Sequence, residues 1–204
     1  EKHLVTPFNA KAMSLFPERI DGKMWAILTV NTDRPPAKIG LISFDNESDL
    51  YNEERWQEWY KRLLVSDDFS LNLQRQVQDQ VEVGAPPIKT KHGWLLFYSH
   101  IKNYFSPERV FTIEAVLLDL KNPLNIIGRT DFPLLAPEEY YEKYGMVPNV
   151  VFPSGALLED DKVLLYYGAA DTTCAVAFVD LPLLIKKFIK KETSFIKLHR
   201  YKNN

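Results

Sequence analysis

The stretch Val83-Gly-Ala-Pro-Pro-Ile-Lys-Thr90, the turn Lys91-His92-Gly93 and the apolar run Trp94-Leu-Leu-Phe-Tyr98 decide the fold. Two short segments rich in β-branched and aromatic residues, separated by a Gly-containing turn, are typical of a β-hairpin. Similar phrases occur twice more in the 204-residue chain: residues 12–20 lead through Asp21-Gly22 into 24–30, and residues 150–158 lead through Glu159-Asp160-Asp161 into 163–167. The sequence therefore predicts one hairpin repeated three times.

A third apolar segment follows each hairpin, at residues 38–44, 110–120 and 175–181. The copies lie roughly 65 to 70 residues apart, against ~40–50 for compact propeller blades, and long intervening loops account for the difference. Repeated antiparallel units predict an all-β fold and favour the blades of a β-propeller. An ordinary β-sandwich of similar hairpins is the alternative that the pattern leaves open.

Two stretches depart from the β pattern. Residues 48–64 place Leu50, Trp56, Trp59 and Leu63 near helical spacing, which predicts a helical insertion over one rim. Residues 181–191 predict a short C-terminal helix. Because no linker is evident, we expect a single domain over residues 1–204, and an incomplete one, since the first residues read as the middle of a domain.

Composition excludes several classes of function. The chain has 25 Lys and Arg against 27 Asp and Glu, so no excess of positive charge favours nucleic acid or an anionic membrane as a partner. No apolar run reaches the ~20 residues of a membrane span. The four His and one Cys lack metal-ligand spacing, and the glycines form no nucleotide-binding motif. We expect no metal and no cofactor; the compartment is left open, with the cytoplasm favoured.

Four phrases, in order, resemble glycoside hydrolase family 130, over residues 15–184: Leu15-Phe-Pro-Glu-Arg-Ile20; Gly84-Ala-Pro-Pro-Ile-Lys-Thr90 with Gly93-Trp-Leu-Leu-Phe-Tyr98; Ala115-Val-Leu-Leu-Asp-Leu120 with Ile127-Gly-Arg-Thr130; and Val147-Pro-Asn-Val-Val-Phe-Pro-Ser-Gly-Ala156 with Tyr166-Tyr-Gly-Ala-Ala-Asp171. The resemblance implies a five-bladed β-propeller that cleaves mannosides with inversion, using phosphate or water. Its general acid is an Asp upstream of the Leu-Phe-Pro phrase, and it has no counterpart here. We therefore expect about three blades in this chain.

The chain departs from the pattern of the family's phosphorylases at two positions. The Lys and the His that contact phosphate in those enzymes are replaced by Gln80 and Ser99. Neither residue carries a positive charge, so the resemblance implies a weaker hold on phosphate. His100 is adjacent to Ser99, but neighbouring side chains in a strand point to opposite faces.

Two carboxylates, Glu82 and Glu114, stand where the phosphorylases look small or apolar. An acidic side chain inside an apolar strand is costly unless it is paired or takes part in the chemistry. An inverting hydrolase needs a second carboxylate to activate water, so Glu82 or Glu114 is the candidate catalytic base. The alternative is a structural Glu paired with an Arg such as Arg109 or Arg129.

Six residues are candidates for substrate binding: Asp171, Tyr167, Asn149, His100, Asn103 and Tyr104. The resemblance places Asp171 in the sugar subsite, and a carboxylate can accept hydrogen bonds from two sugar hydroxyls at once. We expect Asn103, Tyr104 and His100 to lie in a loop between two strands, which suits a role on the acceptor side. A turn aspartate, a core tyrosine and ordinary loop surface are the corresponding structural alternatives.

These observations favour an inverting glycoside hydrolase acting on β-linked manno-oligosaccharides. One alternative is a β-mannoside phosphorylase that uses inorganic phosphate and releases mannose 1-phosphate. Another is a non-catalytic propeller fragment that only binds glycan. Because an incomplete propeller leaves open sheet edges and an exposed core side, we also expect the chain to form a homo-oligomer or to be part of a larger protein.

Overall fold

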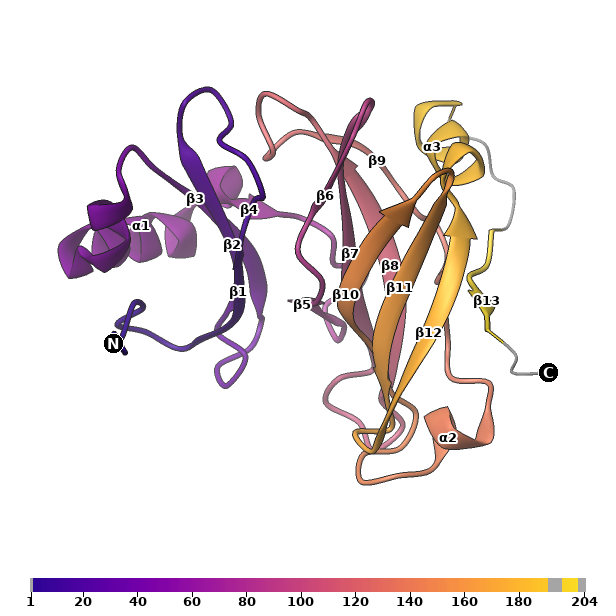
Figure 1. The fold of residues 1–204 in the computed structure, drawn as a ribbon. Helices are drawn as coiled ribbons and strands as arrows, with labels where there is room; N and C mark the ends of the chain where they lie inside the picture. Colours follow the sequence, from indigo (N-terminus) through magenta and orange to yellow (C-terminus); the bar gives the residue numbers. More distant parts are fainter. Residues whose placement is uncertain (1, 191–195, 202–204) are drawn as a thin grey trace.

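The computed structural model describes residues 2–190 and 196–201. These residues form three antiparallel sheets that lie side by side, with few helices (Figure 1). The first sheet has the order β1-β2-β3-β4, with β1 (Ala10–Leu15), β2 (Met24–Val30), β3 (Lys38–Phe44) and β4 (Ser70–Leu71). The predicted strand at 12–20 is shorter than expected and shifted toward the N-terminus, because Pro17 follows the end of β1 and cannot donate to the ladder.

The second sheet has the order β5-β7-β8-β9, with β5 (Gln80–Val83), β7 (Gly93–Lys102), β8 (Val110–Leu118) and β9 (Ile126–Arg129). The expected strand over residues 83–90 is broken, because Pro86 and Pro87 separate β5 from β6 (Ile88–Thr90), which also pairs with β7. Gly84 lies at this break, where a Cβ atom would come within 2.3 Å of Pro153 in the third sheet.

The third sheet repeats the arrangement in the order β10-β11-β12-β13. Its strands are β10 (Val151–Glu159), β11 (Lys162–Ala169), β12 (Thr173–Asp180) and β13 (His199–Arg200). In the described residues, each of the three antiparallel sheets thus consists of strands that follow one another along the chain. This is the coarse architecture that the repeated hairpins predict.

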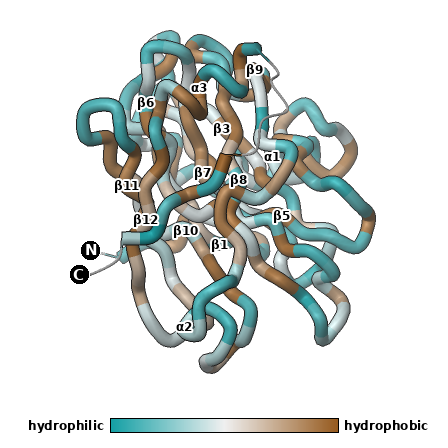
Figure 2. Tube along the Cα trace, turned by 90° about the vertical axis from the view of Figure 1, so that its right-hand side faces the viewer, coloured by the Kyte–Doolittle hydropathy of each residue, from teal (hydrophilic) through white to brown (hydrophobic). Residues whose placement is uncertain are grey.

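The middle sheet is buried on both faces. Leu96 and Val116 pack with Ile27 and Leu41 of the first sheet, whereas Phe97 packs with the third sheet. Because successive side chains of a strand point to opposite faces, the continuous apolar run of β7 serves both interfaces. Figure 2 shows hydrophobic residues along the strands and hydrophilic residues along many of the connecting loops.

Helix α1 (Glu53–Val65) covers the outer face of the first sheet (Figure 1). Its Asn52 cap accepts a hydrogen bond from the Arg55 amide at 3.1 Å. Trp59 is buried, and its ring nitrogen donates to the Leu41 carbonyl at 2.9 Å. Gly40 leaves room for that ring, since a Cβ atom there would lie 2.7 Å from it. The 3-10 turns η1 (Glu47–Tyr51) and η2 (Asp67–Phe69) flank α1.

Two further helices are short. Helix α2 (Tyr140–Lys143) lies between β9 and β10 in the chain, and α3 (Leu181–Lys190) follows β12. The predicted C-terminal helix therefore corresponds to α3, and its last expected residue, Lys191, lies outside the described residues. Among the described helices, none has the length and apolar character needed to cross a membrane.

One end of the three sheets, which we call the hairpin end, carries the same connection three times. At this end, the turn that follows β2, β7 or β11 is hydrogen-bonded to the segment just before β1, β5 or β10 of the same sheet. The bonds run from Asn31 N to Asn9 O (3.0 Å), from Tyr104 N to Gln78 O (3.0 Å) and from Ala170 N to Val150 O (2.9 Å). Asn31, Asn103 and Asp171, in or next to these turns, have positive φ values of 62°, 54° and 51°. The repeat therefore presents polar turn residues at one common end.

Candidate active site

The hairpin end brings together four of the residues predicted to bind substrate. The amide of Phe111, at the start of β8, donates to the Asn149 carbonyl at 3.0 Å, which places the β7–β8 loop with Asn103 and Tyr104 near Asn149. The next residue, Val150, accepts the hydrogen bond from the β11–β12 turn that holds Asp171. Asn103, Tyr104 and Asn149 are half-buried.

Asp171 lies exposed in a tight turn. Ala170 and Asp171 both have positive φ, 46° and 51°, and the Thr172 amide donates to the Ala169 carbonyl at 3.0 Å, as in a type I′ turn. No side chain among residues 2–190 and 196–201 bonds its carboxylate. Both carboxylate oxygens can therefore accept hydrogen bonds from a ligand.

Tyr167 lies elsewhere. It is fully buried, and its hydroxyl donates to Glu142 at 2.8 Å. Glu142 is 0% exposed, and Arg200 donates to its two oxygens from Nε and Nη2, both at 2.8 Å. The backbone amides of Glu138 and Glu139 donate to Glu142 Oε2 at 2.7 and 2.9 Å. This buried network joins α2, β11 and β13, so Tyr167 serves the core rather than the surface.

The charges of this network stabilise each other. Burial alone would raise the pKa of Glu142, but the hydrogen bonds from Arg200 and from two backbone amides hold the pKa below its ordinary 4.5. Burial would lower the pKa of Arg200, and the Glu142 carboxylate more than reverses that effect. Burial and the Tyr141 and Glu142 side chains raise the pKa of the Tyr167 hydroxyl, so it remains a hydrogen-bond donor.

A pH-dependent contribution to stability follows. Because the pKa of Glu142 is lower in the folded protein, its contribution is present above about pH 4.5 and is lost as the pH falls through the lower folded value. We expect Glu142→Gln to be less stable than the wild type at neutral pH and the difference to shrink below about pH 4.5. Urea unfolding of both proteins at several pH values checks this; a difference that did not change with pH would contradict it.

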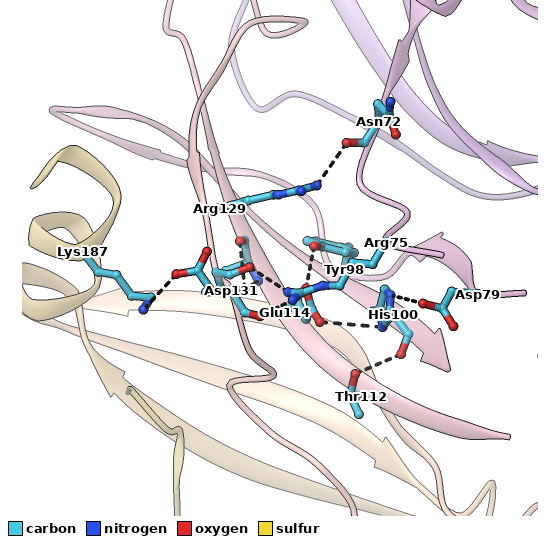
Figure 3. A network of polar contacts seen from close by, with 12 residues as sticks. Asn72, Arg75, Asp79, Tyr98, His100, Thr112, Glu114, Arg129, Asp131 and Lys187 are labelled. Carbon is cyan, nitrogen blue, oxygen red and sulfur yellow. Dashed lines mark hydrogen bonds and ion pairs between the residues drawn. The ribbon is translucent and has the colours of Figure 1, made fainter. Parts of the chain in front are cut away.

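Glu114 lies in a second buried network (Figure 3). It is 1% exposed, and its Oε2 accepts hydrogen bonds from the Tyr98 hydroxyl at 2.8 Å and from Arg75 Nη2 at 2.6 Å. Arg75 also donates to the carbonyls of Thr130, at 2.8 Å, and Asp131. The structural alternative of a Glu paired with an Arg thus describes Glu114, but the partner is Arg75 and not Arg109 or Arg129.

His100 lies in β7 and not in a loop as predicted; it is buried and extends this network toward the hairpin end. Its Nδ1 lies 3.7 Å from Glu114 Oε1, and its Nε2 lies 3.3 Å from Asp79 Oδ2. Burial lowers the pKa of His100 despite the two neighbouring carboxylates, which favours the neutral imidazole. The other Asp79 oxygen accepts a hydrogen bond from the Asn103 amide at 3.3 Å, so Asp79 connects the buried network to the loop.

Glu82 lies on the opposite face of the same sheet. It pairs with Ser99 on β7, whereas Glu114 pairs with Tyr98. Since Tyr98 and Ser99 are neighbours in one strand, the two glutamates point to opposite faces. Glu82 is 4% exposed and its Oε1 lies 2.9 Å from Lys11 Nζ. The two candidate bases therefore do not share one cleft.

Two buried polar groups lie near Glu82. Gln80 Nε2 and Ser99 Oγ are buried and have no hydrogen-bond partner among the described residues. Gln80 and Glu82 are two residues apart on β5, and Ser99 is opposite Glu82, so the register places all three on the same side of the sheet. An unpartnered buried polar group is costly, so these two atoms stand out as a polar feature beside Glu82.

One cavity lies away from all of these residues. A volume of about 510 Å³ lies between the β6–β7 turn and α3, and its lining includes His92, Leu158 and Ile185 but none of the predicted site residues. Within the part of the chain that the structure describes, no group of three or more His, Cys, Asp or Glu side chains could hold a metal ion.

Sequence reasoning did not identify Arg75, Asp79, Glu142 or Arg200. Arg75 and Glu114 are 39 residues apart, and Arg200 and Glu142 are 58 apart. Neither pair has a local spacing that links its members. For Glu114 the available signal was an acidic residue inside a predicted apolar strand. Such a residue indicates that a buried partner is present, but it does not identify that partner.

Comparison with known proteins decides the family. A family model for glycoside hydrolase family 130, described as beta-1,4-mannooligosaccharide phosphorylase, matches residues 2–190. The chain belongs to glycoside hydrolase family 130. The resemblance found in its four phrases is thereby confirmed.

Individual members of family 130 are similar to most of the chain. The 1,2-beta-oligomannan phosphorylase of Thermoanaerobacter sp. (strain X514) is 37% identical over 171 residues, which cover 84% of this chain and 51% of the relative. The beta-1,2-mannobiose phosphorylase of Listeria innocua is 34% identical over 170 residues, 81% of this chain and 42% of the relative. The chain thus spans about half the length of the curated relatives it matches.

Solved structures are also similar to most of the chain. The beta-1,2-mannobiose phosphorylase from Listeria innocua, in complex with beta-1,2-mannobiose, has a TM-score of 0.71 and 30% identity, covering 90% of this chain and 47% of the other. A putative glycosidase from Bacteroides thetaiotaomicron has a TM-score of 0.62 and 26% identity, covering 84% of this chain and 50% of the other.

Proposed function

We propose that this chain is part of a β-mannoside phosphorylase that cleaves β-1,2-linked manno-oligosaccharides with inorganic phosphate. The observation that carries the proposal is the similarity, at 37% and 34% identity, to proteins named as phosphorylases of β-1,2-linked mannosides. These relatives fit the phosphorylase alternative better than the hydrolase favoured by the residues Gln80, Glu82, Ser99 and Glu114 alone.

The three sheets correspond, in this proposal, to three blades of a five-bladed propeller within a single domain that includes residues 1–204. The recurring backbone connection at the hairpin end supports it, because equivalent turns of every blade then face the same opening. Asp171, Asn149 and Asn103 would contact the sugar from these turns, as loop residues on a rigid scaffold commonly do.

Two polar side chains and one ion pair surround the position that this proposal assigns to phosphate. Although neither residue is charged, Lys11 of the neighbouring sheet brings its Nζ to 2.9 Å from Glu82, which is opposite Ser99. Lys11 is half-exposed, and the buried Gln80 Nε2 and Ser99 Oγ are without partners among the described residues. Two donors and a cation suit an anion such as phosphate, and phosphate bound here would compete with Glu82 for Lys11.

The two glutamates are less suited to act as a hydrolytic base. A base must be free to accept a proton from water in the reaction. Glu114 already accepts hydrogen bonds from Tyr98 and Arg75, and Glu82 is paired with Lys11. In the proposed reaction a phosphate oxygen forms the bond to the anomeric carbon while the glycosidic bond breaks. The leaving oxygen takes a proton from the family's general acid, an Asp that the resemblance places upstream of the Leu15-Phe-Pro phrase.

Product analysis tests this function. The polypeptide that contains residues 1–204 is incubated with β-1,2-mannobiose, with and without inorganic phosphate. We expect mannose 1-phosphate and mannose, in equal amounts, only when phosphate is present. Free mannose formed at the same rate without phosphate would instead support the hydrolase, and the loss of that activity in Glu82→Gln or Glu114→Gln would identify its base. Binding of mannobiose without any product would support the non-catalytic glycan-binding alternative.

A further inference from the structure

Helix α2 exposes a pair of aromatic side chains. Tyr140 is 77% and Tyr144 is 62% exposed, and their ring centroids lie 4.7 Å apart with 36° between the ring planes. Because they are four residues apart, they share one face of the helical turn. Met146, two residues further, is 84% exposed. Together these three residues form what we call the tyrosine strip.

The opposite side of α2 is fixed to the core. Glu142 lies between the two tyrosines in sequence and is fully buried. Its carboxylate is held by Arg200, by Tyr167 and by two backbone amides, and its carbonyl accepts a hydrogen bond from the Val150 amide at 3.1 Å. The tyrosines are therefore exposed on a rigid support, which lowers the entropy that a ligand loses when it binds to them.

The tyrosine strip is continuous with the turn that holds Asp171. The Met146 amide donates to Thr172 Oγ1 at 3.0 Å, and the Val147 amide donates to the Ala170 carbonyl at 3.2 Å. Gly145 allows this contact, since a Cβ atom there would lie 2.4 Å from that carbonyl. Tyr144 directly precedes the residues that contact this turn. Tyr140 is four residues earlier, which at a helical rise of ~1.5 Å per residue places it about 6 Å further along the helix axis.

We propose that the tyrosine strip binds the additional sugar units of a manno-oligosaccharide whose terminal unit lies at Asp171. This inference rests on the proposed function and extends it to substrate chain length. The apolar CH face of a pyranose packs against an aromatic ring while its hydroxyls stay in water, and tyrosine has both an apolar face and a polar edge. A stable protein partner would need about 800 Å² on each side, far more than three side chains supply.

The test measures how affinity depends on chain length. Calorimetric titration of the protein with β-1,2-mannobiose and with the corresponding mannotetraose gives the ratio of the two dissociation constants. We expect the wild type to bind the tetraose more tightly, and Tyr144→Ala to reduce that preference about tenfold. Tyr144→Phe should retain it, because the ring face and not the hydroxyl makes the contact. Tyr51→Ala removes a tyrosine of similar exposure (54%) in η1 and is the matched control.

The possible outcomes separate the two proposals. If the wild type binds neither sugar, the proposed function fails. If it binds both sugars equally, or if Tyr144→Ala weakens both equally, the function stands and the strip proposal is overturned. Light scattering gives a further outcome. If the wild type has the mass of a dimer and Tyr144→Ala that of a monomer, the strip proposal is overturned, because a second copy of the chain would then cover the tyrosine strip.

Discussion

Replacing Arg200 with methionine is expected to lower the free energy of unfolding by about 3–5 kcal/mol, the usual result of removing one partner from a buried ion pair. Glu142 would remain fully buried with an uncompensated charge, since Arg200 donates to both of its oxygens. The Ala136 carbonyl would also lose the hydrogen bond that Arg200 Nη2 makes at 2.8 Å. Urea unfolding of the two proteins at pH 7 measures the difference.

The control for this variant is Lys197→Met, which removes a nearby cation from an exposed pair. Lys197 lies 2.7 Å from Glu138, and the two side chains are 50% and 46% exposed. Exposed pairs contribute about 0–1 kcal/mol, so the control should differ little from the wild type. Equal losses of unfolding free energy in the two variants would show that the burial of Glu142 does not account for the effect of Arg200→Met.

Replacing Asp171 with asparagine is expected to lower kcat/KM for β-1,2-mannobiose about 100-fold, if the chain acts as proposed. A charge-assisted hydrogen bond contributes about 1.5–3 kcal/mol, and a tenfold change in rate corresponds to about 1.4 kcal/mol. Asparagine tolerates the positive φ of 51° at this position, so the turn should keep its conformation. Phosphorolysis rates with the purified protein measure the effect.

Asp160→Asn is the matched control. Asp160 is also an exposed turn aspartate with φ of 51°, but it lies in the β10–β11 turn, at the other end of the strand that leads to Asp171. It should keep normal turnover. A normal rate in Asp171→Asn would remove this residue from the sugar site and leave it a turn residue only.

Much of the fold could be predicted from the sequence because its signals are local. The Asp21-Gly22 and Lys91-His92-Gly93 turns, each between apolar runs, predict hairpins, and the structure has them. The helical spacing of Trp56, Trp59 and Leu63 predicts α1, whose buried face consists of these residues. The break at Pro86-Pro87 was not predicted, although proline cannot donate a hydrogen bond to a strand ladder.

The candidate site was only partly predictable. The family resemblance indicated Asp171 and Asn149, and the structure places both at the hairpin end with Asn103. Tyr167 belongs to the same matching phrase as Asp171, but its side chain lies in the core, where its hydroxyl donates a hydrogen bond to the buried Glu142. Glu82 and Glu114 look equivalent in sequence, yet a difference of one residue in register on β7 turns them to opposite faces.

The sequence by itself determined the repeated hairpins, the helix that becomes α1 and the membership of family 130, since each depends on neighbouring residues or on the order of short phrases. Only the tertiary structure decided which charges meet: Arg75 with Glu114, Arg200 with Glu142 and Lys11 with Glu82. The physical reason is that a buried charge requires a partner, but any cation brought close by the packing of the sheets can supply it. Strand register and sheet packing, which depend on the whole chain, make that choice.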